Sequence, residues 1–251
     1  MGNGVENTVT TLDLFDILLH HHKPQHWWPG DSFFEIITGA VLTQNTNWTN
    51  VSQAIDRLKQ EALLEPRAMW NASPDIVKQC ITPAGYYNVK YNRLRSFLAY
   101  LIGTDLDFHA FFRTDLIPLR TKILGIKGIG PETADSILLY AFHRPIFVVD
   151  AYTRRMFSRL GHRWIIDAPY EQIQSFFHQS LPKEASFFNE AHALIVAHSK
   201  KVCKKTPRCG QCVLVDQCER RVGSNESKDK KDKADMPKKE KSWGVGISNM
   251  R

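Results

Sequence analysis

The 251-residue sequence lacks any run of 18 apolar residues, so it offers no candidate for a membrane-spanning helix. The stretch Met1–Asp13 is polar and has no apolar segment after a basic one, which argues against a secretory signal. The chain shows no internal repeat and little strand signal. We therefore expect a cytoplasmic protein that does not bind membranes.

Acidic side chains are in the minority: 26 Asp and Glu stand against 33 Lys and Arg, for a net charge of +7 and a pI near 9.1. This balance favours an anionic partner, although net charge says nothing about fold. Residues 222–251 carry 8 basic and 5 acidic side chains, a net of +3, so residues 1–221 keep only +4 of the total. Any anion site on the body must therefore be built locally.

Apolar residues recur at helical spacing between short polar breaks, which predicts an all-α fold. The short run Pro145–Val149 has no partner run, so we interpret it as a buried connector and not as a strand. The expected helices include one after the caps Thr10 and Thr11 that buries Leu12, Phe15, Leu18 and Leu19, an almost wholly apolar one at Phe33–Leu42, and others marked by Trp48 to Leu58, Ser73-Pro74, Leu94 to Gly103, Pro131 to Ala141 and Ala185 to Lys200.

From Gly223 onward the composition changes to Lys, Asp, Ser and Glu, with almost no large apolar residue before Trp243. Such a segment cannot bury enough surface to offset its ordering entropy, so residues 222–251 are expected to form a disordered basic tail. The tail either adds nonspecific affinity for polyanions or only solvates the chain. The run His20 to His22 is expected to be a solvated face.

Cysteine is scarce, and four of the five lie within 16 positions: Cys203, Cys209, Cys212 and Cys218. In a chain without an export signal, this crowding of cysteines indicates a metal site in a reducing compartment. Cys80 is expected to be a small core residue. The spacing Cys-x5-Cys-x2-Cys-x5-Cys suits a [4Fe–4S] cluster or a tetrahedral zinc ion. Two Cys-x-x-Cys pairs would favour zinc; only one is present. Lysines and arginines around the loop suit a phosphate backbone.

Glycines interrupt the helical pattern in the segment Leu124–Ala134 (LGIKGIGPETA). One helix ends at Leu124, and Pro131 begins the next after a tight Gly-Ile-Gly turn. The free N–H groups of Ile129 to Glu132 would point outward at a helix N-terminus, which suits a phosphate. The alternative is a plain connection between two helices.

Asp150 ends the apolar run 147–149 and precedes the basic helical segment Ala151–Arg155. A helix N-cap is the common role of such an aspartate. A carboxylate held between apolar residues and a helix start is also a candidate functional group.

In chain order, the glycine turn at 124–134, Asp150 and the four-cysteine loop resemble the endonuclease III superfamily of helix–hairpin–helix DNA glycosylases, from about Trp27 to Arg221. The resemblance implies two helical domains with the active site in the cleft between them. It predicts an N-terminal segment 1–30 that packs with the C-terminal domain, a central domain 31–145 with the hairpin at 124–134, and a C-terminal domain 146–221 with the cluster loop 203–218.

By the same resemblance, Gly128-Ile129-Gly130 is the hairpin that holds a DNA phosphate, Asp150 is the essential aspartate, and the four cysteines hold a [4Fe–4S] cluster. The first cysteine gap is five residues where the family usually has six, which puts the shape of the loop in doubt. Two further segments match: Gln44 is similar to the glutamine that fills the gap left by an extruded base, and Tyr86 to a second wedge against the opposite strand.

Glu132 stands where strand-nicking members of the family carry lysine. An amine must attack the sugar to form a Schiff base, and a carboxylate cannot. The chain therefore resembles the monofunctional kind, in which water is the nucleophile and Asp150 stabilises the oxocarbenium-like transition state and orients that water. Lys127 and Lys200 are expected to face phosphate; a displaced lysine with lyase activity is the alternative.

Trp27 and Trp28 precede the first buried helix, and Trp48 follows the Gln44 corner. These tryptophans would stack on a flipped, cationic base, which favours an alkylated purine such as 3-methyladenine. The segments resemble the 3-methyladenine DNA glycosylases; the alternative is that the tryptophans are core or hinge residues. The expected partner is double-stranded DNA with damaged bases, bound by a monomer that is nucleoid-associated if the source is bacterial. Alternative functions are a glycosylase for oxidised, mismatched or deaminated bases, or a non-catalytic DNA-binding module.

Overall fold

The computed structural model describes residues 9–28 and 30–219, and this part of the chain is helical with no strand. The expected all-α fold is confirmed. The tail proposed for residues 222–251 lies outside the described residues. The α-helices are α1 (Thr11–His22), α2 (Phe33–Leu42), α3 (Trp48–Gln60), α4 (Pro66–Asn71), α5 (Pro74–Ile81), α6 (Tyr87–Gly103), α7 (Phe108–Arg113), α8 (Leu116–Leu124), α9 (Pro131–Ser136), α10 (Ala151–Arg159), α11 (Tyr170–Ser180) and α12 (Ala185–Lys201).

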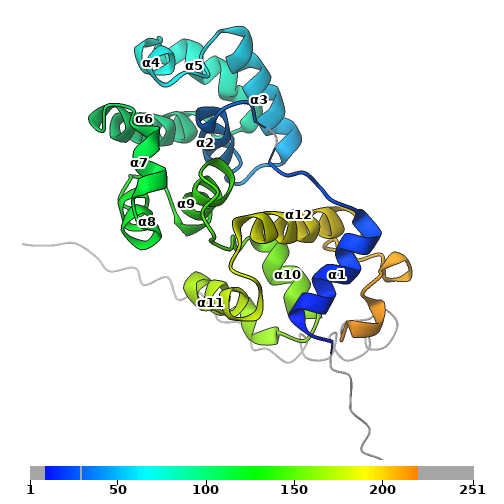
Figure 1. The fold of residues 1–251 in the computed structure, drawn as a ribbon. Coiled ribbons are helices and arrows are strands. Elements are labelled where there is room, and N and C mark those ends of the chain that lie inside the picture. The colour runs from blue at the N-terminus through cyan, green and yellow to red at the C-terminus, as the bar shows by residue number, and fades with distance from the viewer. Residues whose placement is uncertain (1–8, 29, 220–251) are drawn as a thin grey trace, which may run out of the picture.

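Short helical turns complete the described chain. Those of the 3-10 type are η1 (Thr82–Ala84), η3 (Arg163–Ile166), η4 (Cys209–Gln211) and η5 (Val215–Gln217), whereas η2 (Ile137–Ala141) is a π-helical turn that continues α9. Figure 1 shows α2 to α9 gathered in one group and α10 to α12 with the cysteine loop in another. Helix α1 packs on α12, so the start of the described chain lies with its end.

Helix α2 lies at the centre of the first group, as its apolar composition predicts. Every residue from Phe34 to Leu42 is buried, and Ser32 caps the helix by accepting a hydrogen bond from the Glu35 N–H. Because no face of α2 is polar, it must be covered on all sides, and α3, α6, α9 and η2 supply that cover.

Helix α1 corrects one detail of the expected pattern. Thr10 is the N-cap, and its side chain and that of Asp13 form a capping box. The buried residues are Leu14, Phe15 and Leu18, while Leu12 and Leu19 are each 37% exposed. Phe15 and Leu18 fit both the expected face and the observed one. Residue spacing alone therefore did not identify the side of α1 that packs against α12.

The segment before Asp150 is a buried connector without strand pairing, as expected. Ile146 to Val149 are all buried. The Phe147 N–H donates to His178 Nε2 at 2.9 Å, and the Val149 N–H donates to the Tyr170 hydroxyl at 3.2 Å. Side chains thus replace the ladder bonds that a strand would need, and they hold the connector that delivers Asp150 to α10.

A buried ion pair joins the hairpin helices to α11. The Arg120 guanidinium binds both carboxylate oxygens of Asp135, at 2.7 and 3.0 Å, and Gln174 Nε2 donates to Asp135 and to the Phe147 carbonyl at 2.7 Å each. Asp135 is fully buried, and the bidentate pairing offsets the cost of burying its charge. The network ties α8, α9 and α11 to the connector before Asp150.

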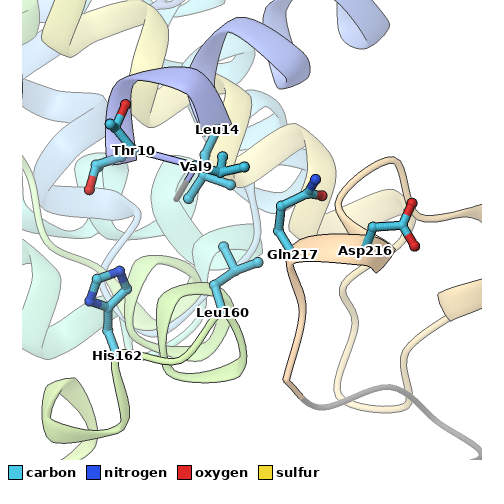
Figure 2. A pocket seen from close by; sticks show the side chains of 8 residues that line it. Val9, Thr10, Leu14, Leu160, His162, Asp216 and Gln217 are labelled. Atoms are coloured by element: carbon cyan, nitrogen blue, oxygen red, sulfur yellow. The ribbon is translucent and has the colours of Figure 1, made fainter. Parts of the chain in front are cut away.

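An open cavity of about 460 Å³ lies between the start of α1, the end of α10 and η5 (Figure 2). None of the predicted catalytic, wedge or hairpin residues lines it. Its lining residues are Val9, Thr10, Thr11, Leu14, Leu160, His162, Asp216 and Gln217. Among the described helices, none is long and apolar enough to cross a membrane.

Candidate active site

Asp150 is the N-cap of α10, and its carboxylate is held on two sides. Oδ1 accepts hydrogen bonds from the Thr153 N–H at 2.7 Å and the Thr153 hydroxyl at 2.8 Å, while Oδ2 lies 3.5 Å from His192 Nε2. The side chain is 11% exposed. The capping role and a functional role are therefore compatible, because capping uses Oδ1 and leaves Oδ2 to face His192.

The surroundings of Asp150 favour its charged form. Burial by itself would raise the pKa of this carboxyl, but the charge of His192 and the bonds from Thr153 outweigh burial and leave the pKa below its usual value. Asp150 is therefore an anion at neutral pH. A fixed anion in a shielded position can stabilise positive charge on a bound molecule.

His192 and Tyr140 complete the cluster around Asp150, and sequence reasoning missed both. His192 lies on α12 and Tyr140 on η2; they are 6% and 2% exposed, and the Tyr140 hydroxyl pairs with His192 Nδ1. One signal was available: His192 is a polar residue inside the buried run Ala191–Val196.

Three tryptophans meet beside this cluster, as the sequence predicts. The Trp28 ring lies 4.8 Å from that of Tyr140 and 4.9 Å from that of Trp48, and the Trp27 and Trp48 ring centroids are 6.5 Å apart. A side chain at Gly39 would lie 3.3 Å from Trp28, so the glycine lets the indole pack on α2. The aromatic wall thus belongs to the same site as Asp150.

Glu132 occupies the first turn of α9, on the hairpin side of Asp150. Burial among neighbouring protein atoms, followed by the charge of Asp150, raises the pKa of Glu132 to about 7 even though the residue is exposed to solvent on one side. His192 and Arg154 act in the opposite direction. Two carboxyls with opposite pKa shifts therefore share this site, one charged and one half-protonated near neutral pH.

Lys200, in the last turn of α12, has its ammonium over the Trp27 ring. Its Nζ lies 5.8 Å from the centre of the Trp27 ring. Burial lowers the pKa of Lys200, and the charge of Asp150 opposes that change. The expectation of a phosphate contact stays a prediction, since the ammonium faces both an indole and the carboxylate region.

The hairpin has the predicted glycine turn between α8 and α9. Gly128 adopts φ +89°, a conformation that favours glycine, and Ile126 and Ile129 are buried beneath the turn. One expectation is wrong: the Ile129 N–H is not free, because it donates to the Ile126 carbonyl at 3.0 Å. Lys127 is exposed at the turn.

The two expected wedge residues lie on either side of one small cavity. Gln44 follows α2, and Tyr86, at φ +47° and 74% exposed, precedes α6. The cavity between them measures about 100 Å³, room for only a few water molecules. Gln44, Asn45, Tyr86, Val89, Lys90 and Arg93 line it.

Lys90 lies beneath the Tyr86 turn. The side chain is 1% exposed, and its Nζ donates to the Ala84 carbonyl at 2.6 Å. Burial, and to a lesser degree the charge of Arg93, lowers the pKa of Lys90 to about 8. This buried lysine holds the turn that presents Tyr86.

The low pKa of Lys90 predicts a pH-dependent stability. An unfolded lysine has a pKa near 10.4, so between pH 8 and 10 the unfolded chain binds more protons than the folded one and stability rises with pH. Relative to Lys90→Met, the wild-type free energy of unfolding should rise by about 2–3 kcal/mol between pH 7 and 10. Urea denaturation at both values measures this rise. An unchanged difference between the two proteins would contradict it.

The four clustered cysteines lie in one partly buried loop after α12, and Cys80 is buried in the core as expected. Burial raises the pKa of Cys212, and charge on the other three cysteine thiols raises it further. Arg159 Nη1 lies 3.2 Å from the Cys203 Sγ, and His198 Nε2 lies 3.4 Å from the Cys212 Sγ. Within residues 9–28 and 30–219, no group of three or more His, Cys, Asp or Glu side chains is arranged to hold a metal ion.

His22 corrects the expectation of a solvated histidine run. Its Nε2 lies 3.1 Å from His198 Nδ1, so it joins α1 to α12 beside the cysteine loop. His198 is 1% exposed, and burial together with the charges of His22 and His21 lowers its pKa to about 4. The donor chemistry around the loop, four thiols with Arg159 and His198 directed at two of the sulfurs, fits an iron–sulfur cluster.

The chain is similar to known DNA repair proteins. Residues 38–183 match the family model of the HhH-GPD superfamily base excision DNA repair protein. A protein of Methanocaldococcus jannaschii that bears the name of a DNA repair glycosylase is 44% identical to this chain over 209 residues. The match covers 82% of this chain and 94% of that protein. Endonuclease III of Sulfolobus acidocaldarius is 29% identical over 188 residues, which cover 74% of this chain and 81% of that enzyme.

Two solved structures have a similar fold. The H. pylori 3-methyladenine DNA glycosylase bound to 1,N6-ethenoadenine superposes with a TM-score of 0.68 at 25% identity, covering 76% of this chain and 98% of that chain. Endonuclease III in a non-covalent complex with DNA gives a TM-score of 0.69 at 22% identity, covering 82% and 92%. At 22% identity the second likeness shows the fold alone.

Proposed function

Because the chain belongs to the HhH-GPD superfamily of base excision DNA repair proteins, we propose that it is a monofunctional DNA glycosylase for alkylated purines such as 3-methyladenine. It hydrolyses the N-glycosidic bond of a damaged base that has left the duplex. The observation that carries this proposal is the ionised Asp150 beside three tryptophans, with a carboxyl and no amine at Glu132.

Asp150 provides electrostatic stabilisation of the transition state. Breaking the glycosidic bond develops positive charge on the deoxyribose, and a carboxylate near C1′ stabilises that charge. The bonds from Thr153 to Oδ1 fix the direction of the side chain, and Oδ2, which faces His192 Nε2, would also orient or deprotonate water. His192 faces the same carboxylate, and the Tyr140 hydroxyl in turn pairs with His192 Nδ1.

The three tryptophans Trp27, Trp28 and Trp48 form the base pocket, and Lys200 at its edge contacts a DNA phosphate. Indole rings attract a flat, cationic base through stacking and cation–π interactions of about 0.5–2 kcal/mol. The positive charge of an alkylated purine also weakens its glycosidic bond, so such a base leaves without a strong acid. The H. pylori enzyme with a similar fold carries 3-methyladenine in its name, which supports this choice of substrate.

The hairpin, Lys127 and the two wedges bind the duplex. Gly128, Ile129 and Gly130 approach a phosphate, with the exposed Lys127 ammonium beside them. Gln44 and Tyr86 enter the space vacated by the flipped nucleotide, which offsets part of the few kcal/mol that flipping costs. We place the duplex between a central domain, residues 31–145, and a second domain built from segments 1–30 and 146–221.

Cys203, Cys209, Cys212 and Cys218 would hold a [4Fe–4S] cluster, which cross-links the loop and supplies structural rigidity when bound. The basic residues of this loop lie on the same chain segment as Lys200. Arg155 Nε donates to the Cys203 carbonyl at 2.9 Å, so the loop is anchored to α10, the helix that Asp150 caps. Loss of the cluster should therefore disturb the active site through α10.

The cluster assignment predicts a metal content. Purified wild-type protein should contain about four iron atoms per chain and little zinc. Cys212→Ser should lose the iron and melt at a lower temperature, while Cys80→Ser, a cysteine outside the loop, should keep it. Elemental analysis with a visible spectrum measures both; a stoichiometric zinc content in the wild type would contradict the assignment.

The proposed function is tested by identifying released bases. Duplexes that carry 3-methyladenine, thymine glycol or uracil are incubated with the protein, and free bases are identified by mass spectrometry. We expect release of the methylated purine. Release from the thymine glycol or uracil duplex alone would overturn the alkyl-purine assignment. Binding without release of a base from any duplex would indicate that the protein is a non-catalytic DNA-binding module.

A further inference from the structure

The Gln44 side chain is held at both ends before any DNA is bound. Its Nε2 donates to the Thr133 hydroxyl at 2.7 Å and to the Gly128 carbonyl at 3.4 Å, and its Oε1 accepts a hydrogen bond from Arg93. Thr133 is itself buried at the start of α9. A wedge residue on a solvent-facing corner would ordinarily be free to rotate, so three partners from two other segments are a specific arrangement.

Arg93 reaches Gln44 by crossing the hairpin. A Cβ at Gly128 would lie only 2.5 Å from the Arg93 Cγ, so the aliphatic part of the arginine rests directly on the Gly128 backbone. The absence of a side chain at Gly128 thus serves two purposes: it permits the turn, and it makes room for Arg93. The guanidinium joins the hairpin to the Gln44 corner.

Arg93 also belongs to the helix that presents the second wedge. Tyr86 is the N-cap of α6, and Arg93 lies two turns further along the same helix. Both line the small cavity with Gln44, and Lys90 holds the turn before Tyr86 from the same face of α6. Helix α6 therefore contacts both wedges and the phosphate-binding turn.

We propose that Arg93 is a positioning residue that holds Gln44 ready for insertion into the duplex and couples it to the grip of the hairpin on DNA. The proposal rests on the proposed function. Orienting Gln44 in the free protein removes the entropy cost of fixing the side chain when a base leaves the stack. Arg93 acts through Gln44 and does not touch the reacting atoms.

The closing experiment compares wild type, Arg93→Ala, Gln44→Ala and the double variant on a duplex that carries 3-methyladenine next to 2-aminopurine. We expect Arg93→Ala to slow base extrusion, followed by fluorescence, and single-turnover base release by about tenfold, the effect of freeing one side chain. In the Gln44→Ala background the same change should have little further effect. Additive effects of the two changes would overturn the proposal.

Two comparisons separate this role from a simple charge or a structural role. Arg93→Lys keeps the cation, so it should bind undamaged DNA as the wild type does but recover only part of the extrusion rate. Lys127→Ala should weaken DNA binding without changing extrusion of the bound base. In the Arg93→Ala variant without substrate, nitrogen relaxation should show that the Gln44 side-chain amide has become mobile. A rigid amide in that variant overturns the inference even if no base is released, and failure of the wild type on every lesion refutes the proposed function instead.

Discussion

Replacing Asp150 with asparagine should reduce base release on the order of a thousandfold while leaving DNA binding largely intact. The asparagine carbonyl can still accept the two hydrogen bonds from Thr153, so the cap of α10 is kept. The negative charge that faces His192, and that we propose stabilises the sugar, is lost. Single-turnover base release and a binding titration on the same duplex measure the two effects separately.

A matched control for Asp150→Asn is Glu171→Gln, which removes a carboxylate from the first turn of α11, where the side chain is 62% exposed. This change should leave the rate of base release within about twofold of the wild type, because exposed charges contribute little. Turnover retained by Asp150→Asn would show that the aspartate is only a helix cap. Equal losses of binding and turnover would indicate that the variant had disturbed the fold.

Replacing Glu132 with lysine should create an activity that the wild type lacks. The charge of Asp150 raises the pKa of Glu132, so an amine on this turn would lie near the position that we propose for the sugar. A lysine there can attack C1′ of an abasic site and form a Schiff base. Borohydride should trap a covalent protein–DNA adduct with Glu132→Lys and none with the wild type.

Glu132→Gln is the control for this gain of activity, since it removes the charge without supplying a nucleophile. It should give no adduct with abasic DNA. An adduct formed by the wild type would mean that another lysine, such as Lys127, acts as the amine. In that case the assignment of water as the nucleophile would be wrong.

The helices were predictable because their apolar residues recur with the period of the buried face. The helix Phe33–Leu42 was predicted from its almost wholly apolar composition, and it is buried from Phe34 to Leu42. The connector before Asp150 was also expected, since a lone apolar run cannot form a sheet. The buried side of α1 was not predicted correctly, because Leu12 and Leu19 are as apolar as the buried Leu14 and Leu18, so composition does not distinguish the two helical faces.

The site was only partly predictable for the same physical reason. Asp150 and the tryptophans carry local signals, a cap position and indoles near a turn, whereas Gln44 was identified only by the family resemblance. His192 lies 42 positions from Asp150, and Arg93 lies 49 positions from Gln44. Such pairs are brought together by packing between helices, which no spacing within one segment encodes.

The most direct measurement of the central claim follows one 3-methyladenine duplex with the wild-type protein, counting free base and broken strands in the same reaction. Hydrolysis led by Asp150 predicts that base accumulates while the strand stays intact until alkali cleaves the abasic site. Strand breaks that appear in step with base release, without alkali, would contradict it.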